Sequence, residues 1–186
     1  GSTRHPISTM SISDDQRRED KRRTLCLILQ QLGDRHVFEF GVEPTDSGFT
    51  GVLQTTWREL LDDGLVDDKM SSMGHPAFRL TPAGWLRAMT ISGAVDLPDV
   101  RDRCTRLAKS LKAVVKGRHS HYDEFASIDS VAASAQIPRG WVYNAVKARL
   151  LGVVFPDDRW DAEIDPKSRT LIRVSPTFGL NHLLEE

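Results

Sequence analysis

The feature that most constrains the fold is a pattern that occurs twice in the chain, about 90 residues apart. The stretch Phe-Arg-Leu-Thr-Pro-Ala at 78–83 matches Ile-Arg-Val-Ser-Pro-Thr at 172–177 in chemical type at every position. Upstream, Gly-Leu-Val at 64–66 matches Gly-Val-Val at 152–154. In both copies a helix, a glycine, an apolar strand, a turn, a second strand and a hydroxyl-proline helix start follow in the same order. Self-similarity over such a period predicts two units of similar fold.

Apolar periodicity locates the expected helices and strands. Leucine and isoleucine at helical spacing predict a first helix that ends before Gly33, and a second helix is predicted over 52–63. A heptad pattern over 99–116 predicts a long helix whose apolar seam packs either in the core or against a second copy. A short helix and a tight turn over 128–140 precede a longer helix over 141–151. Strands are expected at 36–40, 65–66, 77–80, 153–155 and 170–174, and final helices after Thr81-Pro82 and Ser175-Pro176.

The second copy carries a family resemblance. Residues 128–151 resemble a helix-turn-helix, with Ala132 at the small-residue position where two helices touch, Ile137-Pro138-Arg139 in the turn, and Gly152 closing the recognition helix. With its following hairpin, each copy resembles a winged helix-turn-helix of the MarR and PadR regulator families, over about residues 21–184. In the first copy, residues 41–51 are rich in glycine, proline and turn formers, so the corresponding helix is predicted to be short or absent.

The resemblance implies an α+β protein of two tandem winged-helix domains, mainly helical with small β-hairpin wings. Residues 1–20 are expected to be a tag remnant and a flexible arm, because they are polar and Met10 lies inside them. The N-terminal winged-helix domain is expected over 21–98 and the C-terminal one over 99–186, with 99–116 as the linking helix.

Charge is distributed unevenly, although the whole chain has a formal net charge of only -1. The net charge is +2 over residues 1–33, -6 over 34–100, +6 over 101–153 and -3 over 154–186. A polyanion is therefore expected to meet the third segment. The alternative is a solvated face that only keeps the protein soluble.

These observations predict a double-stranded-DNA-binding protein, most plausibly a transcriptional regulator, that reads DNA mainly with the helix over 141–151. Winged helices also serve as protein-interaction modules and in plasmid replication or partition, so both remain as alternatives. On the second copy the predicted contacts are the residues of the recognition helix and the wing that suit base edges or phosphates: Arg139, Trp141, Tyr143, Asn144, Lys147, Arg159, Lys167 and Arg169.

On the first copy, Gln54, Thr55 and Arg58 are the usable outward side chains, whereas Glu59, Asp62 and Asp63 repel phosphates. The first domain, like the 99–116 helix, is therefore a candidate surface for a homodimer or another protein partner. No phosphate-binding glycine loop, nucleophile elbow or zinc-type spacing occurs in the sequence, so no enzyme activity, metal or cofactor is predicted. Two cysteines and no long apolar run predict a cytoplasmic protein with no membrane partner.

Overall fold

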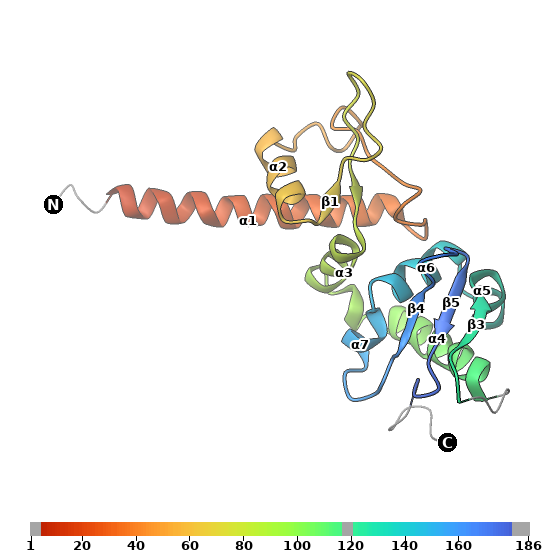
Figure 1. Cartoon of the computed structure of the whole chain (residues 1–186). Coiled ribbons are helices and arrows are strands. Elements are labelled where there is room, and N and C mark those ends of the chain that lie inside the picture. The colour runs from red at the N-terminus through yellow and green to blue at the C-terminus, as the bar shows by residue number, and fades with distance from the viewer. Residues whose placement is uncertain (1–4, 117–120, 180–186) are drawn as a thin grey trace.

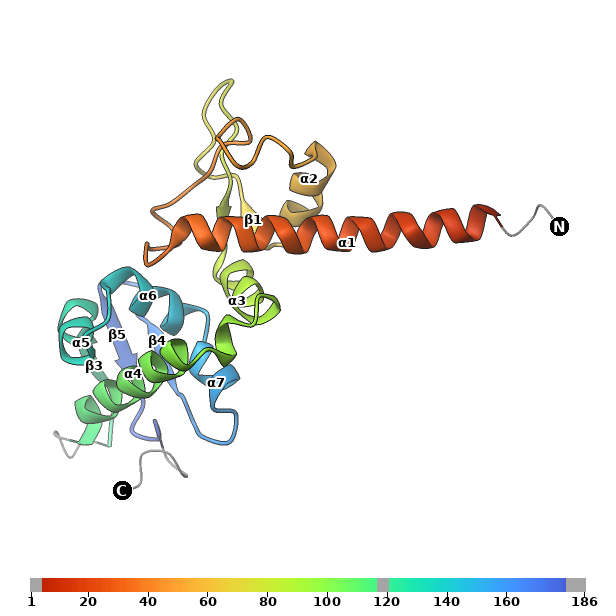
Figure 2. The same ribbon diagram turned by 180° about the vertical axis from the view of Figure 1, so that it is seen from behind.

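The protein is an α+β chain, described here from a computed structural model for residues 5–116 and 121–179, with side chains from residue 13 (Figures 1 and 2). The N-terminal half contains α1 (His5–Leu32), α2 (Gln54–Asp62), a two-stranded antiparallel sheet of β1 (Val66–Asp67) and β2 (Arg79–Leu80), and α3 (Pro82–Ile91). Helix α1 is long, and its N-terminal part extends away from the remaining chain in both views.

The C-terminal half begins after the 3-10 helix η2 (Ala94–Asp96) with the long helix α4 (Pro98–Lys116). There follow β3 (Glu124–Ser127), α5 (Ile128–Ala135), α6 (Arg139–Lys147), α7 (Leu150–Val154), β4 (Ala162–Ile164) and β5 (Leu171–Val174). The three strands form an antiparallel sheet in the order β3-β5-β4, in which Ala126 and Ile164 both pair with Ile172. This order of helices and strands is compatible with a winged helix.

Local signals in the sequence explain where several helices begin. The Thr81 hydroxyl accepts a hydrogen bond from the Gly84 backbone N–H at 3.0 Å, and Pro82 occupies the first turn of α3, where no backbone donor is needed. The Ser127 hydroxyl accepts from the Ser130 N–H at the start of α5. Gly64 has a φ of 73°, a left-handed conformation that lets the chain turn from α2 into β1.

One hydrophobic core runs through both halves. It joins residues of α1 and α2, such as Ile28 and Leu60, to Leu107 of α4, Val142 of α6 and Ile172 of β5. In the apolar seam of α4, Cys104, Leu107 and Leu111 are buried and Val100 and Val114 are half-buried, so the seam packs mainly in the core of the chain. None of the described helices has the length and apolarity required to cross a bilayer.

Several local predictions are wrong. The expected flexible arm is helical, because α1 already begins at His5. Residues 36–40 form turns instead of a strand, and 153–155 lie in or just after α7 rather than in a strand. The helix predicted over 141–151 is split, because Arg149 adopts a left-handed conformation (φ 60°) between α6 and α7. Strand β3 was not predicted, and most of the expected final helix lies outside the described residues.

Candidate functional site

Helix α6, the predicted recognition helix, is enclosed by the N-terminal half of the chain. Trp141, Tyr143 and Asn144 were expected to face DNA, yet all three are buried, and Asn144 has 0% exposed surface. The covering segment consists of residues 34–40, called the 34–40 loop, which connects α1 to the turn-rich region before α2. The prediction that these three side chains lie on an open face is therefore wrong.

Asn144 links α6 directly to the 34–40 loop. Its Oδ1 atom accepts a hydrogen bond from the Val37 backbone N–H at 2.9 Å, and its Nδ2 donates to the Arg35 carbonyl at 2.9 Å. A buried amide that binds two backbone groups stabilises the segment that it contacts, because those groups have no water to replace it. The amide that was expected to contact DNA instead binds two backbone groups from a distant part of the chain.

The start of α6 approaches the same loop so closely that only glycine fits there. A Cβ atom at Gly140 would lie 2.5 Å from the Asp34 carbonyl oxygen and 2.6 Å from the His36 backbone nitrogen. Both neighbours are backbone atoms, which cannot rotate away as the end of a side chain can. Any residue larger than glycine at position 140 would therefore prevent this packing of α6 against the 34–40 loop.

Aromatic and ionic contacts complete the junction. The rings of His36 and Tyr143 have centroids 3.6 Å apart, and Trp85 of α3 meets Trp141 edge-on at 6.0 Å. Arg103 of α4 forms an ion pair with Asp34 at 2.7 Å and places its guanidinium over the Trp141 ring. Packing, hydrogen bonds and charge all hold α6 against the N-terminal half.

Burial gives His36 a pH-dependent effect on stability. Desolvation is the main cause that lowers the His36 pKa below its ordinary value of 6.5; the Glu39 carboxylate opposes the shift, and the Arg139, Arg169 and Arg79 guanidinium groups reinforce it. Its Nδ1 atom accepts a hydrogen bond from the Phe38 N–H, which requires an unprotonated nitrogen. The unfolded chain therefore binds a proton more readily than the folded chain as the pH falls through 6.5.

We accordingly expect this contribution to stability to be complete near pH 8 and to decrease as the pH falls through 6.5, the ordinary pKa of histidine. Thermal unfolding followed by circular dichroism across this range measures the effect. His36→Asn keeps an acceptor near the position of Nδ1 but does not titrate, so its melting temperature should fall less steeply. His75→Asn, at an exposed histidine of the β1–β2 hairpin, should keep the wild-type slope; equal slopes for all three proteins would contradict the assignment to His36.

The remaining predicted residues of the C-terminal half are exposed, two of them at the ends of α6 and three between α7 and β5. They are Arg139, Lys147, Arg159, Lys167 and Arg169. Arg139 pairs with Asp129 of α5 at 2.7 Å, and Lys167 and Arg169 lie in the connection between β4 and β5. These cations can still contact an anionic partner. The Asn144 amide and the Trp141 and Tyr143 rings, which were expected to recognise bases, are buried.

In the N-terminal half, α2 presents Gln54, Thr55 and Arg58 to solvent, in agreement with the predicted outward positions. Two of the carboxylates expected to repel DNA are paired with α1. Glu59 lies 2.9 Å from Arg17, and Asp63 lies 3.2 Å from Lys21. Arg17 of the expected flexible arm, and Lys21 directly after it, thus neutralise part of the acidic face of α2.

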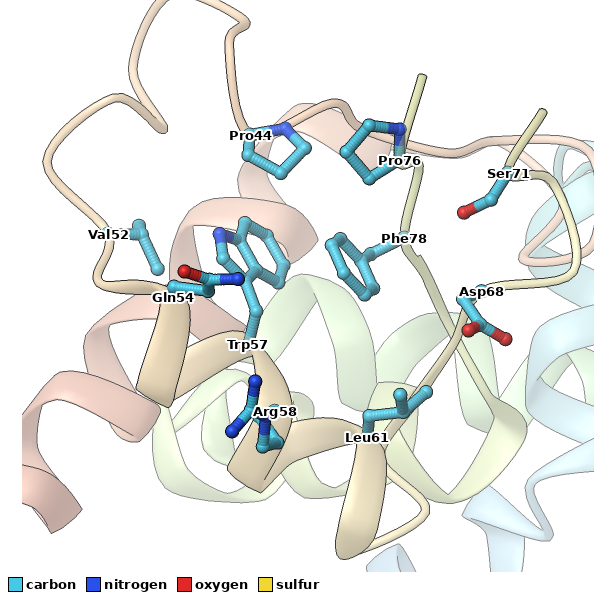
Figure 3. Close-up of a pocket in the computed structure, with 10 residues that line it drawn as sticks. All are labelled: Pro44, Val52, Gln54, Trp57, Arg58, Leu61, Asp68, Ser71, Pro76 and Phe78. Atoms are coloured by element: carbon cyan, nitrogen blue, oxygen red, sulfur yellow. The ribbon is translucent and has the colours of Figure 1, made fainter. Parts of the chain in front are cut away.

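Between α2 and the β1–β2 hairpin lies an open hollow of about 410 Å³, called the α2 hollow (Figure 3). Trp57 and Phe78 form its aromatic wall, stacked with centroids 4.7 Å apart and an interplanar angle of 8°. The hollow is lined by Pro44, Val52, Gln54, Trp57, Arg58, Leu61, Asp68, Ser71, Pro76 and Phe78. Apolar side chains dominate this lining, and a few polar groups lie at its edge, a composition typical of binding pockets.

Sequence reasoning missed this hollow, although one signal for it was present. Residues 41–51 lack helical periodicity, and no helix forms there in the structure. Pro44, within this segment, and Val52, directly after it, instead line the hollow. Among residues 5–116 and 121–179, no group of three histidine, cysteine or carboxylate side chains is placed to hold a metal ion.

No family model, curated protein or solved structure matches the chain.

Proposed function

We propose that this protein is a protein-interaction module built from two winged-helix units that share one core. The observation that carries the proposal is the enclosure of α6: its amide and rings contact the 34–40 loop and α3, where a DNA-reading winged helix needs an open face. In this arrangement the C-terminal unit stabilises the N-terminal unit by packing against it, and the N-terminal unit presents the surface that binds a partner.

The surface chemistry of the N-terminal half supports a protein partner. Leu53, Met70 and Met73 are 58%, 43% and 98% exposed; Leu53 directly precedes α2 and lines a second hollow beside α1, and the two methionines lie in the β1–β2 hairpin. Exposed apolar side chains beside a hollow are typical of protein-binding sites, and methionine adapts readily to varied partners. The net charge of -6 over residues 34–100 opposes binding of a phosphate backbone.

Double-stranded-DNA binding, with a role in transcription regulation, is the second candidate. It is favoured by the +6 segment over 101–153, by the exposed cations at the β4–β5 connection, and by the pairing of Glu59 and Asp63 with α1. In this mode Gln54, Thr55 and Arg58 of α2 would approach the bases, while Lys167 and Arg169 would contact phosphates. It differs from the sequence-based prediction because α6 would not enter the groove.

Fluorescence anisotropy with a labelled random 30-base-pair duplex separates the two candidates. For a protein-interaction module we expect no saturation below about 10 μM protein even at 50 mM salt, a range in which dedicated DNA-binding proteins already bind nonspecifically. The variants Arg58→Ala and Lys167→Ala/Arg169→Ala should behave as the wild type. Submicromolar binding that weakens steeply with salt and is lost in either variant would refute the first proposal and support the second.

A further inference from the structure

A second hollow lies at one edge of the C-terminal sheet, between β3, α4 and α5. It has a volume of about 530 Å³ and is called the β3 hollow. Strand β3 is an outer strand in the order β3-β5-β4, and Figures 1 and 2 show α4 and α5 beside it. Residues 125–127 of β3 line one side of the hollow, and Val114 of α4 and Val131 of α5 line the others together with small side chains of the two helices.

Only alternate residues of β3 form hydrogen bonds with β5. Ile128, directly after β3, donates its backbone N–H to the Thr170 carbonyl at 2.9 Å. Bonded and non-bonded positions alternate along an antiparallel pair, so Ala126 bonds to β5 in the observed register. The backbone groups of Phe125 and Ser127 therefore point away from β5, towards the free edge of the sheet.

This free edge offers both a donor and an acceptor. The N–H and C=O of Phe125 and the N–H of Ser127 form no hydrogen bond with a described residue. The Ser127 carbonyl accepts a hydrogen bond from the Ser130 hydroxyl at 2.9 Å. Unpaired groups at a sheet edge are a template for a further strand. An extended polypeptide, in which N–H and C=O groups alternate at strand spacing, can bind all three groups.

The side chains around the β3 hollow favour an uncharged apolar occupant. No described residue that lines it is charged, and Val114 and Val131 form its apolar part. The exposed Lys109 and Lys116 of α4 lie outside the lining, as does the half-buried Glu124 of β3. A charged group that entered the hollow would lose water without gaining an ion pair there. The volume exceeds the space that one leucine or aromatic side chain fills.

A second copy of the chain does not supply a suitable side chain. Two β3 strands that paired at their free edges would be antiparallel, with a two-fold axis perpendicular to the sheet, so their core-facing sides would coincide. Ala126 faces the core, because it pairs with Ile172, which is 0% exposed, and Glu124 lies on the same face. The second copy would thus present alanine, which is too small, and glutamate, which is charged.

From these observations we infer that the β3 hollow binds an extended segment of a partner protein, which adds a strand to β3 and inserts a large apolar side chain between α4 and α5. The N–H groups of Phe125 and Ser127 donate to carbonyls of the segment, and the Phe125 carbonyl accepts from one of its N–H groups. The inference goes beyond the proposed function, because it assigns a second interaction surface, in the C-terminal half, that does not depend on the α2 hollow.

A phage-displayed library of random linear peptides, selected on the full chain, tests this inference. Enriched sequences should share one large apolar residue. Synthetic peptides made from them should bind the variant Ser134→Trp about tenfold more weakly than the wild type, because Ser134 lines the hollow and the indole would fill it. Ala133→Trp, at the neighbouring exposed residue of α5 that is not part of the lining, should bind as the wild type does.

Methylation of single backbone nitrogens in the peptide tests strand addition on the wild-type protein. Only alternate N–H groups of an added strand face β3, so methylation should weaken binding by about tenfold at alternate residues and leave it unchanged between them. In the protein, the Phe125 amide should exchange its hydrogen about tenfold more slowly when peptide is bound. Phe125→Pro, which lacks this donor, should bind more weakly than Phe125→Ala, which keeps it.

Several results would overturn the inference, and they are distinguishable from failure of the proposed function. Peptides that bind Ser134→Trp as tightly as the wild type would place their site elsewhere and leave the protein-interaction role intact. Equal effects of methylation at all positions, or no enrichment of peptides, would exclude strand addition. A wild-type dimer in sedimentation equilibrium that Ser134→Trp dissociates would identify a second copy as the occupant. The DNA titration described above decides the proposed function independently.

Discussion

Replacing Gly140 with alanine is expected to lower the free energy of unfolding by about 3 kcal/mol, in the upper part of the range for overpacked sites. The added Cβ would stand 2.5 Å from the Asp34 carbonyl oxygen, so that α6 and the 34–40 loop must separate. That separation also strains the ion pair of Asp34 with Arg103. Urea denaturation followed by tryptophan fluorescence measures the change.

Gly152→Ala is the matched control. Gly152 is exposed, lies in the short helix α7, and has no atom within 4 Å of an added Cβ. Alanine there should leave stability unchanged or raise it by up to about 1 kcal/mol, because glycine is the poorer helix former. If Gly140→Ala proved as stable as Gly152→Ala, the close contact between α6 and the 34–40 loop would not exist in solution.

Replacing Asn144 with alanine is expected to cost about 3 kcal/mol as well. The Val37 N–H and the Arg35 carbonyl would each lose their partner, and a buried group left without a hydrogen bond costs about 1–3 kcal/mol. Urea denaturation measures the loss of stability. Amide hydrogen exchange provides a local readout, since the Val37 amide should lose protection first.

Lys147→Ala, on the same helix but exposed, is the control and should change stability by no more than about 0.5 kcal/mol. If Asn144→Ala changed stability as little as Lys147→Ala, the Asn144 amide would not bind the 34–40 loop. It would then be exposed, as the sequence-based interpretation assumed, and α6 would again be a candidate for contacting DNA bases.

Much of the fold was predictable because its signals are local. The hydroxyl and proline of Thr81-Pro82 locate the start of α3, and the apolar period of residues 52–63 predicts α2 within two residues. The strand predicted at 36–40 was wrong for a physical reason. Its aromatic and β-branched residues suit a sheet, but Val37 and Phe38 are used to cover α6 and Tyr143 instead.

The site was less predictable, because it depends on contacts between distant residues. A polar residue on the outer face of an amphipathic helix usually faces water, and Asn144 fits that pattern in the sequence. Its partners lie 107 and 109 residues upstream, and no periodicity within α6 reveals them. The exposure of Gln54, Thr55 and Arg58 was predictable, because the pattern of α2 itself determines which of its sides is buried.

The continuous core has a consequence for how the two halves of the chain can evolve. Two halves that pack independently can diverge, be exchanged or be lost one at a time. Here Gly140 and Asn144 of the C-terminal half fit backbone atoms of residues 34–37 of the N-terminal half. A change on either side must be compensated on the other, so the two halves are expected to covary and to be inherited as a single evolutionary unit.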